Sequence, residues 1–171
     1  MMKNALKYSA VVVIILIILF LILYFNNDIG ILKSGIEKDA RIGHKIDDDW
    51  EVTKSTTDTI SAMIFHDKNI DNHIFSIYVN RKGLSFGYFF RAAGPITKDI
   101  VQYQIEGYKE KIYLSMNKQQ VVKAEIDKGD TVEIIKIDNN KPFALVLPNN
   151  IGAIIFYDIN NEVVQPIPET L

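Results

Sequence analysis

The sequence predicts an all-β extracytoplasmic domain, an antiparallel β-sandwich or barrel-like fold of about 8–10 short strands, preceded by one N-terminal transmembrane helix. Two observations predict this. An uninterrupted apolar run extends from Ala10 to Phe25. From Trp50 onward, apolar and polar residues alternate between turn signals that recur about every ten to twelve residues, the spacing expected of a sandwich or barrel.

The apolar run has the length of a membrane span. With Tyr8 and Ser9 it covers about 18 residues, or about 27 Å of helix, which is close to the roughly 30 Å hydrocarbon core of a bilayer. Tyr8 at one end and Tyr24 with Phe25 at the other suit the two membrane interfaces, where aromatic side chains are enriched. We therefore expect residues 10–25 to contact the lipid bilayer.

The charges that flank the run predict its direction. Lys3 and Lys7 precede it, whereas no basic residue follows it before Lys33. Because cytoplasmic flanks carry the excess of Lys and Arg, the N-terminus is predicted to lie in the cytoplasm and the rest of the chain outside it. The expected location is the cell membrane, with a single pass.

Two other interpretations of the run are weaker. A cleaved signal peptide has an apolar region of about 7–15 residues and a small-x-small cleavage site, whereas bulky residues occupy 23–25 here. A core helix of a soluble protein is disfavoured, because the run is free of charges and lies at the N-terminus between asymmetric flanks.

The domain organisation follows from these segments. We expect a short cytoplasmic N-terminus (1–9), a transmembrane helix (10–25), a juxtamembrane stalk (26–45) and an extracytoplasmic β-domain (46–171). The stalk contains three glycines and mixed charges, and Ile31–Ala40 could form a short helix within it. The 146 residues after position 25 are enough for one domain with a sizeable core.

The composition excludes several classes of function. All 21 acidic residues and 17 of the 19 basic residues follow the apolar run, so this part carries about −4, which is no footprint for nucleic acid. Cysteine is absent, which rules out disulfides, thiolate metal sites, cysteine nucleophiles and a lipidated cysteine. No Walker loop, dinucleotide fingerprint or paired-carboxylate signature occurs, and we expect no cofactor.

One short motif resembles the turn that carries a serine nucleophile. Gly83–Gly87 fits the pattern G-x-S-x-G, which needs a strand before the serine and a helix after it. Here a strand pattern follows, and no histidine lies after His73 to complete a triad in the required order. We therefore expect Gly83 to close a hairpin, and Gly87 to let another backbone or a large ring approach closely.

The segment Asp67–His73 places oxygen side chains at alternate positions, like the start of an EF-hand loop. Asn72 stands where that loop needs glycine, and Tyr78 stands where it needs a bidentate glutamate. His66 and His73 could face each other across the loop, but two imidazoles fall short of the three protein ligands of a catalytic zinc site. A polar hairpin loop is the favoured interpretation, and no metal site is predicted.

The densest aromatic cluster supplies the one candidate binding site. Alternation along this strand sends four large side chains to a predicted core face: Leu84, Phe86, Tyr88 and Phe90. Phe89 and Arg91 point to the opposite face and are of the types enriched at binding hot spots. They are the predicted partner-binding residues.

The expected function is that of a bacterial membrane-anchored protein whose β-domain has a non-catalytic binding or envelope-assembly role. Isoleucine, lysine and asparagine are frequent, as in AT-rich bacterial genomes. Candidate partners are the bilayer and another envelope or membrane protein. The alternatives are an extracytoplasmic hydrolase with an unrecognised active site, and a ligand-sensing subunit of a membrane complex. Sensing would need such a partner, because about nine cytoplasmic residues cannot form a transducing domain.

Overall fold

The computed structural model describes residues 2–81, 83 and 85–171, with only the backbone described for residues 2–7 and 10. Leu84, which was assigned to the predicted core face, therefore lies outside the described residues. So do the side chains of Lys3 and Lys7, on which the predicted orientation depends.

The described part of the chain is mostly β-structure, which confirms the prediction of an all-β domain with antiparallel sheets. Its twelve strands form three four-stranded sheets. The first sheet has the order β1 (Glu51–Thr56), β2 (Ile60–His66), β3 (His73–Asn80), β4 (Tyr88–Gly94). The middle sheet has the order β12 (Ile167–Thr170), β5 (Val101–Gln104), β6 (Glu110–Ser115), β9 (Phe143–Pro148). The outer sheet has the order β11 (Val163–Val164), β10 (Ile154–Asp158), β7 (Val121–Asp127), β8 (Val132–Lys136). Only the β12–β5 pair among these is parallel.

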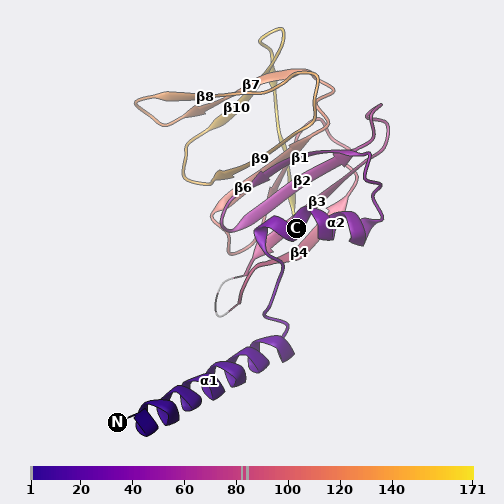
Figure 1. Ribbon diagram of the computed structural model, residues 1–171. Coiled ribbons are helices and arrows are strands. Elements are labelled where there is room, and N and C mark those ends of the chain that lie inside the picture. The colour runs from indigo at the N-terminus through magenta and orange to yellow at the C-terminus, as the bar shows by residue number, and fades with distance from the viewer. Residues whose placement is uncertain (1, 82, 84) are drawn as a thin grey trace.

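The sheets are stacked, and a short helix, α2 (Ile36–His44), covers the free face of the first sheet (Figure 1). The burial of both faces of β6 explains why a third sheet is present. Ile112 and Leu114 pack toward the first sheet, whereas Tyr113 between them packs toward the outer sheet. A sheet buried on both faces needs a cover on each side. The described chain therefore forms three sheets, whereas the predicted β-sandwich has two.

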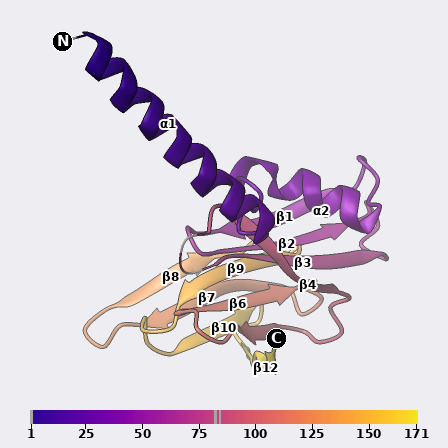
Figure 2. The ribbon, with the colours of Figure 1, turned by 90° about the horizontal axis from the view of Figure 1, so that it is seen from below.

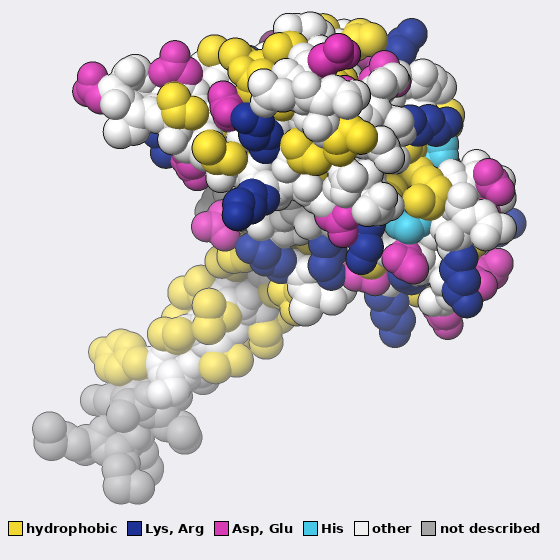
Figure 3. Space-filling model, turned by 90° about the horizontal axis from the view of Figure 1, so that it is seen from above, with side chains coloured by type: hydrophobic (Ala, Val, Ile, Leu, Met, Phe, Trp, Pro, Cys, Tyr) yellow, Lys and Arg dark blue, Asp and Glu magenta, His cyan; other side chains and the backbone are white. Residues whose placement is uncertain are grey.

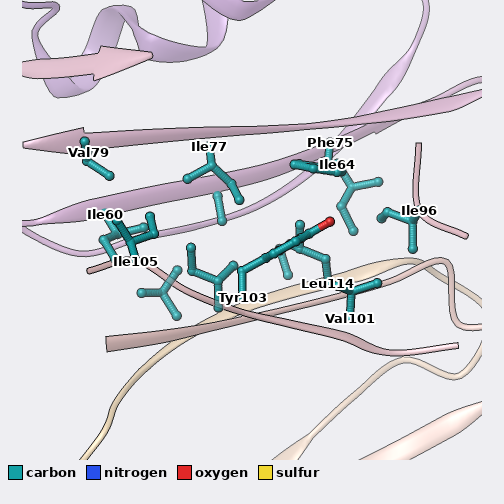
Figure 4. Close-up of a cluster of buried hydrophobic side chains, with 14 of the residues drawn as sticks. Ile60, Ile64, Phe75, Ile77, Val79, Ile96, Val101, Tyr103, Ile105 and Leu114 are labelled. Carbon is teal, nitrogen blue, oxygen red and sulfur yellow. The ribbon is translucent and has the colours of Figure 1, made fainter. Parts of the chain in front are cut away.

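The largest core lies between the first and middle sheets. In Figure 4, side chains of β2 and β3 point toward those of β5 and β6. Phe75 and Tyr103 meet across this layer with ring centroids 5.2 Å apart. Each fully buried aliphatic or aromatic side chain of this kind contributes about 1.5–3 kcal/mol. The labelled members are Ile60, Ile64, Phe75, Ile77, Val79, Ile96, Val101, Tyr103, Ile105 and Leu114.

Helix α2 is fixed to the first sheet by one apolar face and one cation. Ile36 and Ala40, four residues apart, are buried against that sheet. The Arg41 guanidinium lies 5.1 Å from the Phe65 ring centroid and donates to the Trp50 carbonyl at 3.0 Å. Part of the predicted stalk is thus built into the domain.

The residues just before α2 are paired with the domain as well. We call residues 28–32 the strap. Ile29 forms a parallel bridge with Phe86, and Ile31 forms an antiparallel bridge with Tyr88 at the start of β4. The amide of Ile31 donates to the Tyr88 carbonyl at 2.8 Å, and the amide of Tyr88 donates back at 2.8 Å. The predicted stalk is therefore hydrogen-bonded to β4.

Two glycines allow the strap and β4 to approach. A Cβ on Gly30 would lie 2.6 Å from the Tyr88 carbonyl oxygen, and a Cβ on Gly87 would lie 2.7 Å from the Ile31 carbonyl oxygen. Both distances are too short for a side chain. Gly87 also has a φ of +87°, which glycine adopts without strain. The expected close approach at Gly87 is confirmed.

Helix α1 (Met2–Phe25) precedes the strap and projects from the domain (Figures 1 and 2). Leu23 is its only buried side chain among those described. Over the described residues, none of the helices has the combined length and hydropathy needed for a membrane crossing.

Replacing Gly87 with alanine tests the strap. We expect Gly87→Ala to lower the free energy of unfolding by about 1–3 kcal/mol more than Gly107→Ala, because only its new Cβ meets a backbone oxygen. Gly107 is the matched control, since its φ is +82° and nothing lies within 4 Å of its Cβ position. Urea unfolding of the full chain in detergent micelles measures both. Equal losses would contradict the close approach.

The buried tyrosines predict a loss of stability at alkaline pH. Burial raises the pKa of Tyr113 to about 12, above the value of about 10 in the unfolded chain. Because the folded pKa is the higher one, this stabilisation is complete below pH 10 and is lost as the pH rises toward 12. We expect Tyr113→Phe to make the decline in melting temperature between pH 10 and 12 shallower than in the wild type. An unchanged decline would contradict this assignment.

Candidate functional site

The predicted binding residues lie at a β-bulge in β4. Tyr78 pairs with Phe90 and the preceding Ile77 pairs with Ala92, which leaves Arg91 without a partner residue. A bulge of this kind turns side chains away from strict alternation. Arg91 is exposed and Phe89 is half-buried.

Phe89 packs within the chain. The Arg81 guanidinium lies 4.0 Å from the centroid of its ring, and the Cβ position of Gly30 in the strap lies 2.9 Å from its Cε2 atom. The ring therefore fills the space between the strap and Arg81. Its contacts hold β4 to the strap, and its role in partner binding stays a prediction.

The predicted core face of the same strand is buried at only one described position. Tyr88 is buried beneath α2, and its hydroxyl donates to the Thr57 carbonyl at 2.5 Å. Phe90 is 52% exposed, with its ring 5.7 Å from Tyr78 and 5.5 Å from His44. Phe86 is 61% exposed, because it lies before the start of β4, where only the strap backbone pairs with it. The core assignment of Phe86 and Phe90 is thus corrected.

A groove of about 360 Å³ is lined by Arg91 and by a second arginine, Arg81. The Tyr108 hydroxyl within it donates to the Asn80 carbonyl at 3.0 Å, and burial raises the pKa of this tyrosine against the opposing effect of the two arginines. Guanidinium groups suit a carboxylate or phosphate group, and the acid Glu106 also lines this groove. The groove is lined by Val79, Arg81, Phe90, Arg91, Ile105, Glu106 and Tyr108.

A larger cleft of about 800 Å³ also has Tyr108 in its lining. Three connections form it: 57–59 between β1 and β2, 107–110 between β5 and β6, and 148–150 after β9. The Thr59 hydroxyl donates to the Glu110 carboxylate. The Oδ1 atom of Asn149 is buried without a hydrogen-bond partner.

The cleft did not emerge from the sequence as a site. Its turns were visible there as Glu106–Gly107 and Pro148–Asn150. They are separated by about forty residues, and only the pairing of β6 with β9 brings them to the same end of the sheets.

The other motifs have structural roles in the described chain. The Ser85 hydroxyl donates to the Arg81 carbonyl at 2.9 Å, and strand β4 follows it. The Asp67 carboxylate accepts the amides of Asp71 and Asn72 at 3.0 and 3.2 Å, which closes a polar hairpin loop. The side-chain amide of Asn72 donates to the same carboxylate at 2.7 Å, and this bond, helped by the backbone bonds, lowers the pKa of Asp67.

The two histidines near that loop bond to backbone groups. His66 Nδ1 lies 2.8 Å from the Asp67 carbonyl oxygen, and His73 Nε2 lies 3.1 Å from both the amide nitrogen and the carbonyl oxygen of Ile96. Among the described residues, no group of three or more His, Cys, Asp or Glu side chains is placed to hold a metal ion.

Comparisons of the chain with models of known protein families, with curated proteins and with solved structures find no match.

The environments of the three phenylalanines predict a ranking of substitutions. Phe89→Ala should cost about 2 kcal/mol of unfolding free energy, because it removes a packed ring from between the strap and Arg81. Phe86→Ala should stay within about 0.5 kcal/mol, as exposed substitutions do. Urea unfolding of both variants and of Phe90→Ala as a second exposed control measures the order. A larger loss for Phe86→Ala would contradict it.

Proposed function

We propose that α1 anchors this chain in a membrane by a single pass, and that the β-domain serves a non-catalytic binding or envelope-assembly role outside the cytoplasm. One observation carries the anchor. Of the side chains from Val11 to Phe25, all except Leu23 are 43–75% exposed, and every one of these residues is apolar or aromatic. An apolar surface this continuous marks a partner or a membrane.

The arrangement of this surface favours a lipid environment. A helix that is apolar on every side is buried either in a protein core or in a bilayer, and α1 lies outside the core of the domain (Figure 2). The fifteen residues from Val11 to Phe25 would span about 22 Å, which is short of a full crossing. The charge-free stretch begins at Tyr8, and its 18 residues would span about 27 Å, close to the roughly 30 Å of a hydrocarbon core.

The direction of insertion rests on the sequence. Lys3 and Lys7 lie before α1's apolar stretch, and the next basic residue after it is Lys33 in the strap region. This asymmetry favours a cytoplasmic N-terminus and an extracytoplasmic domain.

The binding role is supported by the two hollows that share Tyr108. The groove offers Arg81 and Arg91 to an anionic group, with the exposed Phe90 beside them. Arginine and aromatic side chains are the common anchors of protein interfaces. A partner that presents a carboxylate or phosphate group, on an envelope or membrane protein, fits this surface.

Protease accessibility tests the anchor and its direction. The full chain, expressed in a bacterium with a C-terminal tag, should sediment with membranes, and protease added to intact spheroplasts should remove the tag. A cytoplasmic protein serves as the control for intact cells.

Three results would contradict the proposal. A protected tag would reverse the orientation. A tag in the soluble fraction would show that α1 does not anchor the chain in a membrane. A mature chain that begins near Asn26 would replace the anchor with a cleaved signal peptide.

A further inference from the structure

We propose that one defined face of the β-domain rests on the membrane that α1 enters, seated there by four exposed apolar side chains. These are Phe25, Ile29, Leu32 and Phe86, which we call the collar. This inference rests on the proposed anchor and adds to it the position of the domain relative to the lipid.

The connection between α1 and the domain is too short to act as a free tether. The Asp28 amide donates to the Leu23 carbonyl at 2.9 Å, and Asn27 has a φ of +54°, so the chain leaves the helix through a closed turn. The next residues are already bonded to the domain, because the Phe86 amide donates to the Asp28 carbonyl at 2.8 Å. Only Asn26 and Asn27 separate the helix from the strap.

The end of α1 is itself covered. Leu23 is 7% exposed, whereas its helical neighbours Ile22 and Tyr24 are 52% and 59% exposed. Other atoms of the chain therefore cover one side of the last turns. A helix end that is both covered and followed by a hydrogen-bonded strap sets the orientation of the domain relative to α1.

The collar lies at the C-terminal end of α1, where the proposed span leaves the bilayer. Phe25 and Leu32 are each 75% exposed, Phe86 is 61% exposed, and Ile29 is 39% exposed. Phe25 is the last residue of α1, and Ile29 and Leu32 follow it within seven residues. Phe86 is bridged to Ile29. The backbone of Phe86 is joined to the residues just after this end of the helix, because the Gly30 amide donates to the Phe86 carbonyl at 2.6 Å. Exposed Phe and Leu side chains of membrane-bound proteins insert at the boundary between the headgroups and the acyl chains.

Charge contributes little to this seating. Lys33 lies 3.6 Å from the Asp58 carboxylate, and the Arg81 guanidinium stacks on Phe89. The side of the domain near α1 in Figure 3 carries basic and acidic side chains together. Because the signs are mixed, the attraction comes from the apolar collar, and neutral phosphatidylcholine lipids should support it.

The seating also places the cleft near the membrane. Asp58, which pairs with Lys33 next to the strap, belongs to the β1–β2 turn that lines the cleft. A ligand in the cleft would therefore bind close to the lipid surface.

Fluorescence quenching by spin-labelled lipids tests the inference. Each variant of the full chain also carries Trp50→Phe, so that the introduced tryptophan is the only one and gives all of the tryptophan emission. The protein is placed in phosphatidylcholine nanodiscs whose lipids carry a nitroxide near the headgroups. Phe86→Trp should lose most of its emission. The loss should persist at about 1 M salt, where the Debye length falls to about 3 Å.

Two matched positions complete the design. Ile159→Trp is the distant control, because Ile159 is 50% exposed and the turn after β10 lies far from α1 in Figure 1. Its emission should persist. Leu16→Trp, within the apolar stretch of α1 and read with nitroxides on the acyl chains, reports the anchor itself.

The outcomes separate the two proposals. Quenching at Leu16→Trp without quenching at Phe86→Trp would overturn the seating and leave the anchor intact. No quenching at either position would overturn both. Equal quenching at Phe86→Trp and Ile159→Trp would mean that no defined face meets the lipid. A blue shift at Phe86→Trp without quenching would mean that protein covers the collar, which also overturns the seating.

Discussion

Burial of both faces of the central strands is the constraint on which this structure depends. Strand β2 is buried at every position, and β6 is buried at its last four residues, Ile112–Ser115. A strand covered on one face leaves alternate residues for water, but β2 and the Ile112–Ser115 part of β6 leave none. The stack therefore needs α2 beyond the first sheet and the outer sheet beyond the middle one. The same constraint explains why Ser61 and Ser76 are among the few polar residues buried in the first sheet.

The strap is where this stack meets α1. Its pairing with β4 depends on the absence of side chains at Gly30 and Gly87, because the two backbones approach within the space that a Cβ would need. Phe89 then fills the gap beside the strap, under Arg81. A residue whose type suggested a binding hot spot is thus used to join two parts of the chain. Arg91 stays exposed because the bulge removes it from the ladder.

The end of the sheets that holds the groove and the cleft combines the features that support a binding role. The groove with Arg81 and Arg91 and the larger cleft meet at Tyr108, whose hydroxyl is fixed by the Asn80 carbonyl. The cleft is built mainly from connections between strands, whereas the groove combines residues of β3 and β4 with the connections next to them. In the proposed arrangement this end lies beside the membrane, so that the binding surface and the anchor act on the same region of the envelope.

The sequence by itself determined the local properties of this protein. Period-two alternation identified the β-domain, because side chains of a strand point to opposite faces. The apolar run identified α1, and the position of Gly87 between aromatic residues indicated a close approach of another backbone. Only the tertiary structure decided the number of layers, the packing of Phe89 against the strap and the exposure of Phe86. Those properties depend on which distant strand, strap or helix covers a given face, and alternation along one strand specifies the faces of that strand but not what packs against them.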